Sequence, residues 1–567
     1  MVFSEFPYER VDLQAEGEKI DALIEQFKNA ATAQEAIDCV EQFNALLHES
    51  STMRTISNIR ASVNTADPFY EAEQKYYGAN MPAIQQKTVI FQNLMLESPF
   101  RAQLEQEYPP VAFKNAEIAA RTISPEVLEL LGEESRLVRE FQKMNSSITI
   151  ELDGKTMNSA QVIPYKQSTD RAMRIAAVKA EGKACLDNAD KLDYYYDELV
   201  KVRTAIARKL GHEKFTPLGY DRMARNGYGP ADVAAFRQQV KNVLVPLCTR
   251  LKKAQAERLG LDKLGFWDDD LHTNSGNAAP ILEGEELYKA GVQMYRDMHP
   301  DTAAMIDRMD SLQTFDLVSK KGKRGGGFCT RLMGYKVPFI FANWNGTAGD
   351  VKVFTHEGGH AFNGWLMMNR DKTPINLART TNETAEVHSM SMEFLSWKFM
   401  ERFYGKKADE ARVAHLLNAL YFIPYGCMVD EFQHIVYDNP DLTPAQRHEA
   451  WADLEKQYRP WIDFTGAPFF EEGRTWQRKH HIYNYPFYYI DYCLAQTVAL
   501  QVLSIMLEKG WDAAWEVYVN FTKQFGDDTF VNMLANAGLD NPFKPGTLQN
   551  TLAAIEKFVD ENLHHLK

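Results

Sequence analysis

The sequence predicts a mainly α-helical protein with one small β-sheet beside a helix that carries two histidines. Two observations predict this class: apolar residues recur at three- and four-residue spacing over long stretches, and only two segments break that spacing. At 567 residues the chain is far longer than the usual single hydrophobic core, so two or more lobes are expected. We place a helical lobe at 1–200 and a second lobe, which contains the two histidines, at 201–567.

Four segments have the amphipathic spacing of long helices. They cover residues 40–63, 192–211, 233–260 and 493–510. In each segment the apolar positions fall on one side of a helix with 3.6 residues per turn, which indicates packing against a neighbouring element. The sequence contains neither an internal repeat nor a low-complexity segment, so these helices belong to ordinary globular lobes.

Two segments read as strands. Residues 147–162 alternate between apolar and polar side chains around Asp153-Gly154, which is typical of a two-residue β-hairpin turn. Residues 325–345 begin with three glycines and continue as KVPFIFANW, an apolar and aromatic strand that Asn345-Gly346 ends as a turn. Asp350 then follows as the expected N-cap of a helix.

The net charge is −14 at pH 7, which argues against nucleic acid or an anionic membrane as a partner. The six cysteines are scattered without a CxxC pair, as is usual in a reducing compartment. The first twenty residues lack the basic and apolar regions of a secretory signal, and no run of about 18 apolar residues occurs. These features predict a cytoplasmic protein that does not span a membrane.

The most informative motif is HEGGH at residues 356–360. On a helix His356 and His360 lie one turn apart, so both imidazoles can bind one metal ion while Glu357 stays beside it. This arrangement lets a carboxylate deprotonate a zinc-bound water. Gly358 and Gly359 cost the helix about 2 kcal/mol relative to alanine, which we interpret as close backbone approach to a metal or substrate.

A catalytic zinc needs a third protein ligand and one open position. Residues 380–397 offer Glu383, Glu386 and Glu393 on a predicted helix, and spacing alone does not choose among them. His388 on the same helix lies about 200° from Glu386 and is expected to point elsewhere. A third histidine six residues after His360 is absent, because Leu366 stands there.

A second polar cluster lies at residues 477–496. Pro486 is suited to a helix start, and four tyrosines around it lie at helix positions 0, 3, 4 and 7. An aromatic core stripe is the simpler interpretation, yet four phenols beside two histidines make an unusually polar core. In a hydrolase such groups can donate hydrogen bonds to a developing oxyanion. The tyrosines are Tyr485, Tyr488, Tyr489 and Tyr492.

Three elements in this order resemble the thimet oligopeptidase and oligoendopeptidase F family of zinc metallopeptidases. They are HEGGHAF, AEVHSMSMEF and HIYNYPFYYIDYCLAQ, and they look most like the bacterial oligoendopeptidase F and Pz-peptidase branch. The resemblance spans roughly residues 145–510. It implies an elongated, two-lobed helical body around a deep channel that admits oligopeptides, with one zinc ion per chain.

The resemblance also implies a role for individual residues. It makes His356, His360 and Glu386 the zinc ligands and Glu357 the general base. His481, Tyr489 and Tyr492 resemble the family's catalytic oxyanion-stabilising groups. Because His480 and His481 are adjacent, the sequence does not decide which of the two histidines has this role. Tyr485 and Tyr488, with Phe339 and Ala342 on the strand before the HEGGH helix, are expected to contact substrate. That strand would hold an extended peptide by its exposed edge.

The expected activity is therefore cleavage of internal peptide bonds in short oligopeptides. An exopeptidase on the same scaffold is the alternative, and it requires a cation near the zinc to hold a free C-terminus, for which Arg379 and Lys323 are candidates. An inactive peptide-binding module is a further alternative, but no ligand or base is missing. The sequence leaves the oligomeric state open.

Overall fold

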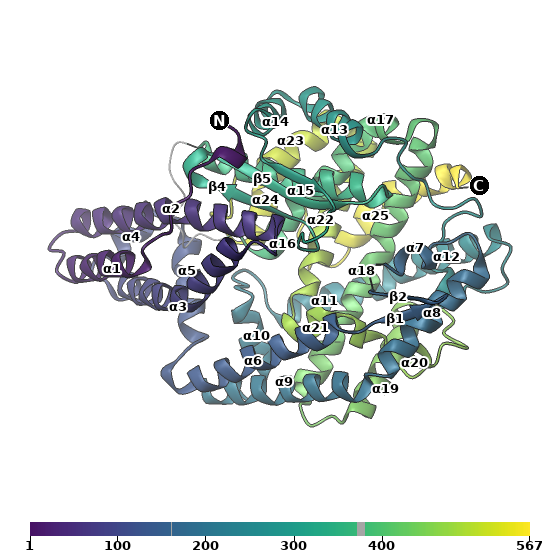
Figure 1. The fold of residues 1–567 in the computed structure, drawn as a ribbon, viewed down its shortest axis with the longest axis horizontal. Coiled ribbons are helices and arrows are strands. Elements are labelled where there is room, and N and C mark those ends of the chain that lie inside the picture. The colour runs from purple at the N-terminus through teal and green to yellow at the C-terminus, as the bar shows by residue number, and fades with distance from the viewer. Residues whose placement is uncertain (160, 371–379, 567) are drawn as a thin grey trace. The chain divides into compact units, whose positions relative to one another are not determined.

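The computed structural model describes residues 1–159, 161–370 and 380–566, and most of them are helical (Figure 1). Contacts divide the chain into two compact units, each built from three segments. Unit 1 contains residues 1–120, 279–408 and 508–539, and unit 2 contains residues 121–278, 409–507 and 540–567. Residue 200, where we expected the boundary between two lobes, lies within unit 2 and inside the helix Ala189–Lys209. The division into lobes 1–200 and 201–567 stays a prediction.

Unit 1 begins with a helical bundle whose core is formed by residues such as Phe27, Phe43 and Phe91. The Phe43 and Phe91 rings stack with centroids 4.1 Å apart. The helices of unit 1 are α1 (Leu13–Lys28), α2 (Ala33–Val63), α3 (Pro68–Glu97), α4 (Arg101–Glu107), α5 (Pro110–Arg121), α13 (Gly284–Met298), α14 (Pro300–Leu312), α15 (Ala348–Met368), α16 (Asn382–Leu395), α17 (Met400–Tyr404), α23 (Trp511–Thr522) and α24 (Phe530–Ala537).

A three-stranded sheet lies beside α15 in unit 1 (Figure 1). Its strands are β3 (Phe315–Val318), β4 (Phe328–Leu332) and β5 (Val337–Trp344). The strand order is β3-β5-β4, with β3 parallel and β4 antiparallel to β5. The central strand β5 is almost continuously buried, which explains its run of apolar residues. The strand predicted from KVPFIFANW is therefore confirmed.

Unit 2 contains the other helices and a small hairpin. Its helices are α6 (Leu128–Ser146), α7 (Ile163–Lys166), α8 (Arg171–Leu186), α9 (Ala189–Lys209), α10 (Phe215–Arg222), α11 (Pro230–Gln239), α12 (Val245–Arg258), α18 (Ala408–Asp438), α19 (Pro444–Tyr458), α20 (Pro468–Glu471), α21 (His480–Asn484), α22 (Tyr489–Lys509) and α25 (Thr547–Asn562). The hairpin pairs β1 (Ile150–Leu152) with β2 (Lys155–Met157). Asp153 and Gly154 both have positive φ, 52° and 72°, as the predicted two-residue turn requires.

The predicted fold class, mainly α with a small sheet beside the HEGGH helix, is confirmed. The four helices expected from periodicity correspond to α2, α9, α22 and the continuous stretch from α11 to α12. Helix α22 is long and apolar enough to cross a membrane by length and composition, but 78% of its apolar window is buried inside the structure. Such burial is typical of a core helix. The two-lobed shape and the channel remain implications of the resemblance.

Candidate metal centre

Helix α15 carries the HEGGH motif and begins directly after the turn that ends β5. Asp350 was expected to be its N-cap, and this prediction is wrong: Thr347 occupies that position. Asp350 lies in the first turn, where its carboxylate accepts hydrogen bonds from the backbone N–H groups of Asn345 and Gly346 at 3.1 and 2.7 Å. The carboxylate thereby fixes the turn between the sheet and the helix.

Three predicted ligands meet at one point in unit 1. Nε2 of His356 lies 3.3 Å from Oε2 of Glu386, and Nε2 of His360 lies 3.7 Å from the same oxygen. One ligand atom from each residue lies within 4.8 Å of the others. Ligands about 2.0–2.1 Å from a tetrahedral zinc are separated by roughly 3.3 Å, so these side chains fit such an ion. Helix α15 supplies the histidines and α16 supplies the glutamate.

Glu393 contributes a contact that the sequence did not assign. Its Oε1 lies 2.7 Å from Nδ1 of His356, which leaves Nε2 of that ring directed at Glu386. Burial by itself lowers the pKa of His356, but hydrogen bonds to Glu386 and Glu393 outweigh it and raise that pKa to about 10. A cation is thus strongly favoured at this point. A carboxylate behind a histidine ligand is the usual support of a metal site.

Glu357 is aimed into the same region. Its Oε2 is buried without a hydrogen-bond partner among the described residues, while the backbone N–H of Cys329 on β4 hydrogen-bonds the carboxylate. Burial raises the pKa of Glu357 to about 7. A buried carboxylate oxygen without a partner is costly unless a ligand or water completes it. The side chain is therefore suited to exchange a proton near neutral pH.

The two glycines of the motif have a different partner from the one expected. A Cβ at Gly358 would lie 1.8 Å from the phenol oxygen of Tyr295, and one at Gly359 would lie 2.2 Å from the carbonyl oxygen of His388. The glycines therefore allow close approach of Tyr295 and of the backbone of α16. The interpretation that they make room for metal or substrate is corrected, because they bring α16, and with it Glu386, against α15.

His388 points away from the ligands, as expected. It is buried, and its Nδ1 lies 3.2 Å from Oγ1 of Thr522 on α23. Burial lowers the pKa of His388 to about 3, so the ring is neutral. Of the other two glutamates on α16, Glu393 binds His356 instead, and Glu383 is not part of the cluster formed by the three ligands.

The substrate-binding role of β5 is not compatible with the sheet order. Both edges of β5 are paired, one with β3 and one with β4, so its backbone cannot hold a peptide. Phe339 and Ala342 are buried, and the Phe339 ring packs against Phe3 with centroids 4.6 Å apart. The expectation of an exposed edge at β5 is therefore corrected, because sequence patterning cannot tell a central strand from a buried edge. The edge strand beside α15 is β4.

In unit 2, His481 lies among three of the predicted tyrosines. Its ring centroid is 5.2 Å from that of Tyr489, 6.0 Å from Tyr488 and 6.5 Å from Tyr492. His480 is more exposed and contacts the His481 ring instead. This geometry favours His481 over its neighbour. Burial lowers the pKa of His481 to about 3, so its imidazole is neutral near pH 7.

The four tyrosines do not share one helix face. Helix α22 begins at Tyr489, and Pro486 lies before it in a non-helical segment, so the helix start expected at the proline is wrong. Phe487 has a φ of 64° and its ring is buried, which turns the chain before α22 and leaves Tyr485 53% exposed. A buried phenylalanine thus overrides the helical spacing.

Lys479 is a second residue that the sequence did not assign. Its ammonium group donates a hydrogen bond to the Tyr489 hydroxyl at 3.1 Å and lies over the Tyr489 ring, 4.8 Å from the centroid. The hydroxyls of Tyr488 and Tyr492 lie 2.9 Å apart. The polar cluster of unit 2 therefore consists of one neutral histidine, three phenols and one lysine.

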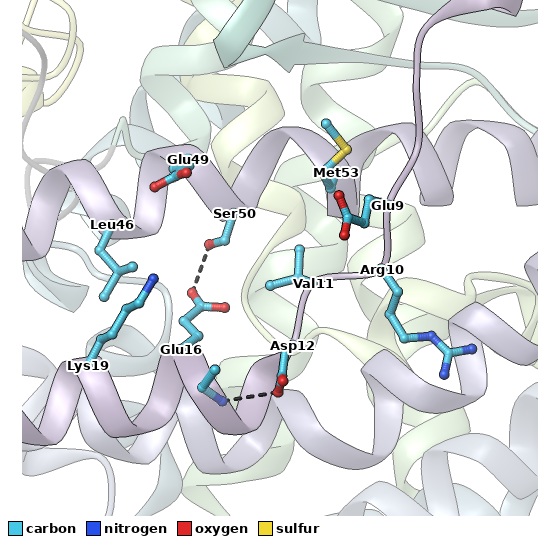
Figure 2. A pocket seen from close by; sticks show the side chains of 11 residues that line it. Glu9, Arg10, Val11, Asp12, Glu16, Lys19, Leu46, Glu49, Ser50 and Met53 are labelled. Atoms are coloured by element: carbon cyan, nitrogen blue, oxygen red, sulfur yellow. Dashed lines mark hydrogen bonds between the residues drawn. The ribbon is translucent and has the colours of Figure 1, made fainter.

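A separate cavity of about 250 Å³ lies among the N-terminal helices (Figure 2). Two of its charged groups have partners shown in Figure 2: Glu16 accepts a hydrogen bond from Ser50, and Asp12 caps the start of α1. None of the predicted ligands or catalytic residues lines this cavity.

Two family models match most of this chain. The model of the peptidase M3 N-terminal domain matches residues 3–123, and that of peptidase family M3 matches residues 164–551. Oligopeptidase PepF of Bacillus subtilis (strain 168) is 22% identical over 507 residues, which cover 84% of this chain and 70% of PepF.

Solved structures are similar over nearly the whole chain. The structure of Pz peptidase A with inhibitor 2 is 38% identical, with a TM-score of 0.91 and 99% of each chain covered. A putative oligoendopeptidase F from Bacillus anthracis str. Ames is 37% identical, with a TM-score of 0.87, and the match covers 99% of this chain and 98% of that one. Because the family model matches more than half of the sequence, the chain belongs to peptidase family M3.

Proposed function

We propose that this protein is a zinc-dependent endopeptidase that cleaves internal peptide bonds of short oligopeptides in the cytoplasm. The observation that carries the proposal is the convergence of His356, His360 and Glu386 on one point, with Glu357 beside them. The net charge of −14 gives no reason to expect nucleic acid as a partner.

The three ligands would hold one divalent ion, with Glu393 fixing the ring of His356. When bound, a zinc ion supplies a Lewis acid that acidifies water and polarises a peptide carbonyl. Three protein ligands leave a tetrahedral position open, as catalytic rather than structural zinc sites do.

Glu357 would act as the general base. Its Oε2 has no hydrogen-bond partner among the described residues, so it is available to accept a proton from the attacking water. The backbone N–H of Cys329 holds the carboxylate in place. With a pKa near the working pH, the same group can later donate that proton to the leaving amine.

His481, Tyr489 and Tyr492 would stabilise the oxyanion of the tetrahedral intermediate. A neutral His481 and phenol hydroxyls can each donate a hydrogen bond, and each such donor is worth about 3 kcal/mol in the transition state. The ammonium of Lys479 polarises the Tyr489 hydroxyl and so makes it a stronger donor. Tyr485 and Tyr488 remain proposed substrate contacts.

An extended substrate would pair with β4. This strand is the edge of the sheet nearest α15, and its residue Cys329 already donates its N–H to Glu357. Backbone pairing along a strand edge holds peptides with little dependence on sequence. The proposal therefore moves the expected peptide-binding edge from β5 to β4.

An exopeptidase needs a fixed cation for the free C-terminus, and one candidate from the sequence is engaged elsewhere. The Lys323 side chain is buried, pairs with Asp316 and donates to the carbonyl oxygens of Asp316 and Val318 at 3.0 Å. Arg379, the other candidate, lies outside the described residues. Lys323 is therefore not available to hold a free C-terminus.

Cleavage of end-blocked peptides of increasing length tests the proposal. The protein with zinc should cut internal bonds, lose activity when the metal is removed and recover it when zinc is restored. Glu357→Gln should bind zinc as the wild type does and lose nearly all turnover. Full activity after measured metal loss would contradict the zinc site. Cleavage only beside a free terminus would indicate an exopeptidase, and peptide binding without cleavage would indicate a binding module.

A further inference from the structure

Arg331 on β4 lies on the strand face that is directed at the motif helix. The Arg331 side chain meets α15 at two residues, Gly364 and Met367. The β4 strand packs against α15. The Arg331 side chain therefore extends over α15 beyond the general base.

Helix α15 is shaped to accept this side chain. Gly364 lies one turn after His360 on the same side of the helix. A Cβ at Gly364 would come within 3.2 and 3.3 Å of Cγ and Cδ of Arg331, so the glycine leaves room for the arginine stem. At the end of that stem, Nη1 donates to the sulfur of Met367 at 2.8 Å. The guanidinium is thus held one to two turns from a metal ligand.

The charge of this guanidinium is not paired with a carboxylate. No acidic side chain in residues 1–159, 161–370 and 380–566 lies within ion-pair distance of Arg331, whereas Arg370 binds Asp527 at 2.8 Å. The thioether of Met367 is only a weak acceptor. Arg331 is exposed to solvent, so its guanidinium is accessible to a ligand.

We propose that Arg331 determines specificity by binding a carboxylate of the peptide substrate. The inference rests on the proposed peptidase function and names a substrate class for it, namely peptides with a carboxylate near the scissile bond. A guanidinium binds a carboxylate through two parallel hydrogen bonds, which fixes its geometry as well as its charge. The carboxylate is that of a Glu or Asp side chain, or that of a free C-terminus.

The test compares matched peptides on wild-type and variant enzyme. One series is end-blocked and carries Glu or the isosteric Gln at each position around the cleaved bond; a second series has a free or amidated C-terminus. Arg331→Met keeps most of the stem and removes the charge, and Arg331→Glu reverses it. Lys289→Met is the control, because it removes an equal charge from an exposed position on α13.

The wild type should prefer the carboxylate peptide at one position by about tenfold or more in kcat/KM, as expected for a charge-assisted pair. Arg331→Met should reduce this ratio of kcat/KM values to about one, whereas the control Lys289→Met should keep the wild-type ratio. Arg331→Glu should favour a third peptide, with Lys at the same position, over the Gln peptide. A preference confined to the end-blocked series identifies an acidic side chain, and one confined to the free C-terminus identifies the terminal carboxylate. Equal ratios in wild type and Arg331→Met in both series overturn the inference.

A binding measurement separates this inference from the proposed function. In the Glu357→Gln background, peptide affinity can be measured by fluorescence polarisation with and without Arg331→Met. If the wild-type enzyme cleaves no peptide, the proposed function fails. A difference in Kd between the Glu peptide and the Gln peptide that disappears with Arg331→Met would still support the role of Arg331. If peptides are cleaved and neither ratio depends on Arg331, only the inference fails. Thermal unfolding of each variant checks that it folds.

Discussion

Oε1 of Glu393 lies 2.7 Å from Nδ1 of His356, on the side of the ring opposite the Nε2 that faces Glu386. This pair sets the tautomer and the orientation of one proposed metal ligand. The two glutamates stand seven residues apart on α16, so one helix supplies both a proposed ligand and the support of a proposed ligand on another helix.

Glu393→Gln should weaken zinc binding about 10- to 100-fold, because the histidine loses the charge that fixes its orientation. Affinity can be measured by competition with a chromophoric chelator. Glu516→Gln, at an exposed position on α23, is the control and should leave zinc affinity unchanged. Equal zinc affinity of Glu393→Gln and wild type would contradict a supporting role.

Gly359→Ala should destabilise unit 1 by about 2–4 kcal/mol, since the new Cβ would overlap the carbonyl of His388 and push α16 away. Zinc affinity should fall with stability because α16 carries Glu386. Urea unfolding and metal content measure the two effects.

Gly78→Ala is the matched control in the same unit. Nothing lies within 4 Å of a Cβ built at this position in α3, so alanine should stabilise the helix by about 0.5–1 kcal/mol. A Gly359→Ala protein as stable as Gly78→Ala would show that α15 and α16 are not held as closely as described.

Lys479 and Tyr489 should act as one unit in catalysis. Tyr489→Phe should lower kcat more than it changes KM, because its hydroxyl is proposed to act in the transition state. If Lys479 works through that hydroxyl, Lys479→Met should add little to the loss in the double variant. Steady-state kinetics of the two single variants and the double variant measure this. Fully multiplicative losses would exclude the coupling.

The buried His272 should make unit 2 sensitive to acid. Burial lowers the pKa of its imidazole to about 4, and Nε2 lies 3.0 Å from Oδ1 of Asn418. The unfolded chain binds the proton near pH 6.5, so the stabilisation from the neutral ring is complete above that pH and is lost as pH falls towards 4. The total loss is about 3 kcal/mol.

The His272 effect is best measured as a difference. Urea unfolding of wild type and His272→Gln between pH 7.5 and 4.5 compares a ring that titrates with an amide that does not. The variant should be less stable at neutral pH but lose stability more slowly on acidification. Parallel pH profiles would mean that other groups account for the acid sensitivity.

Local patterns in the sequence were sufficient for the fold class, the hairpin and the pair of histidines in the candidate metal site. Helical spacing, Asp153-Gly154 and HEGGH each depend on residues close together in the chain, so their geometry follows from one helix or one turn. The prediction of Glu386 as the third ligand required more than a local pattern. Spacing alone left three glutamates as candidates, and the family resemblance chose among them. The structure places that residue with the two histidines.

Tertiary packing decided what the local patterns could not. The apolar pattern of β5 is the same for a central strand as for a buried edge, and only pairing with β3 and β4 showed that its edges are occupied. The tyrosines after His481 have helical spacing, yet the burial of Phe487 breaks the helix. The sequence by itself determined that His356 and His360 lie one turn apart on the same side of a helix, because one helix sets their spacing. The partners of Gly359, Glu393 and Arg331 were decided by contacts between distant elements, which no local spacing encodes.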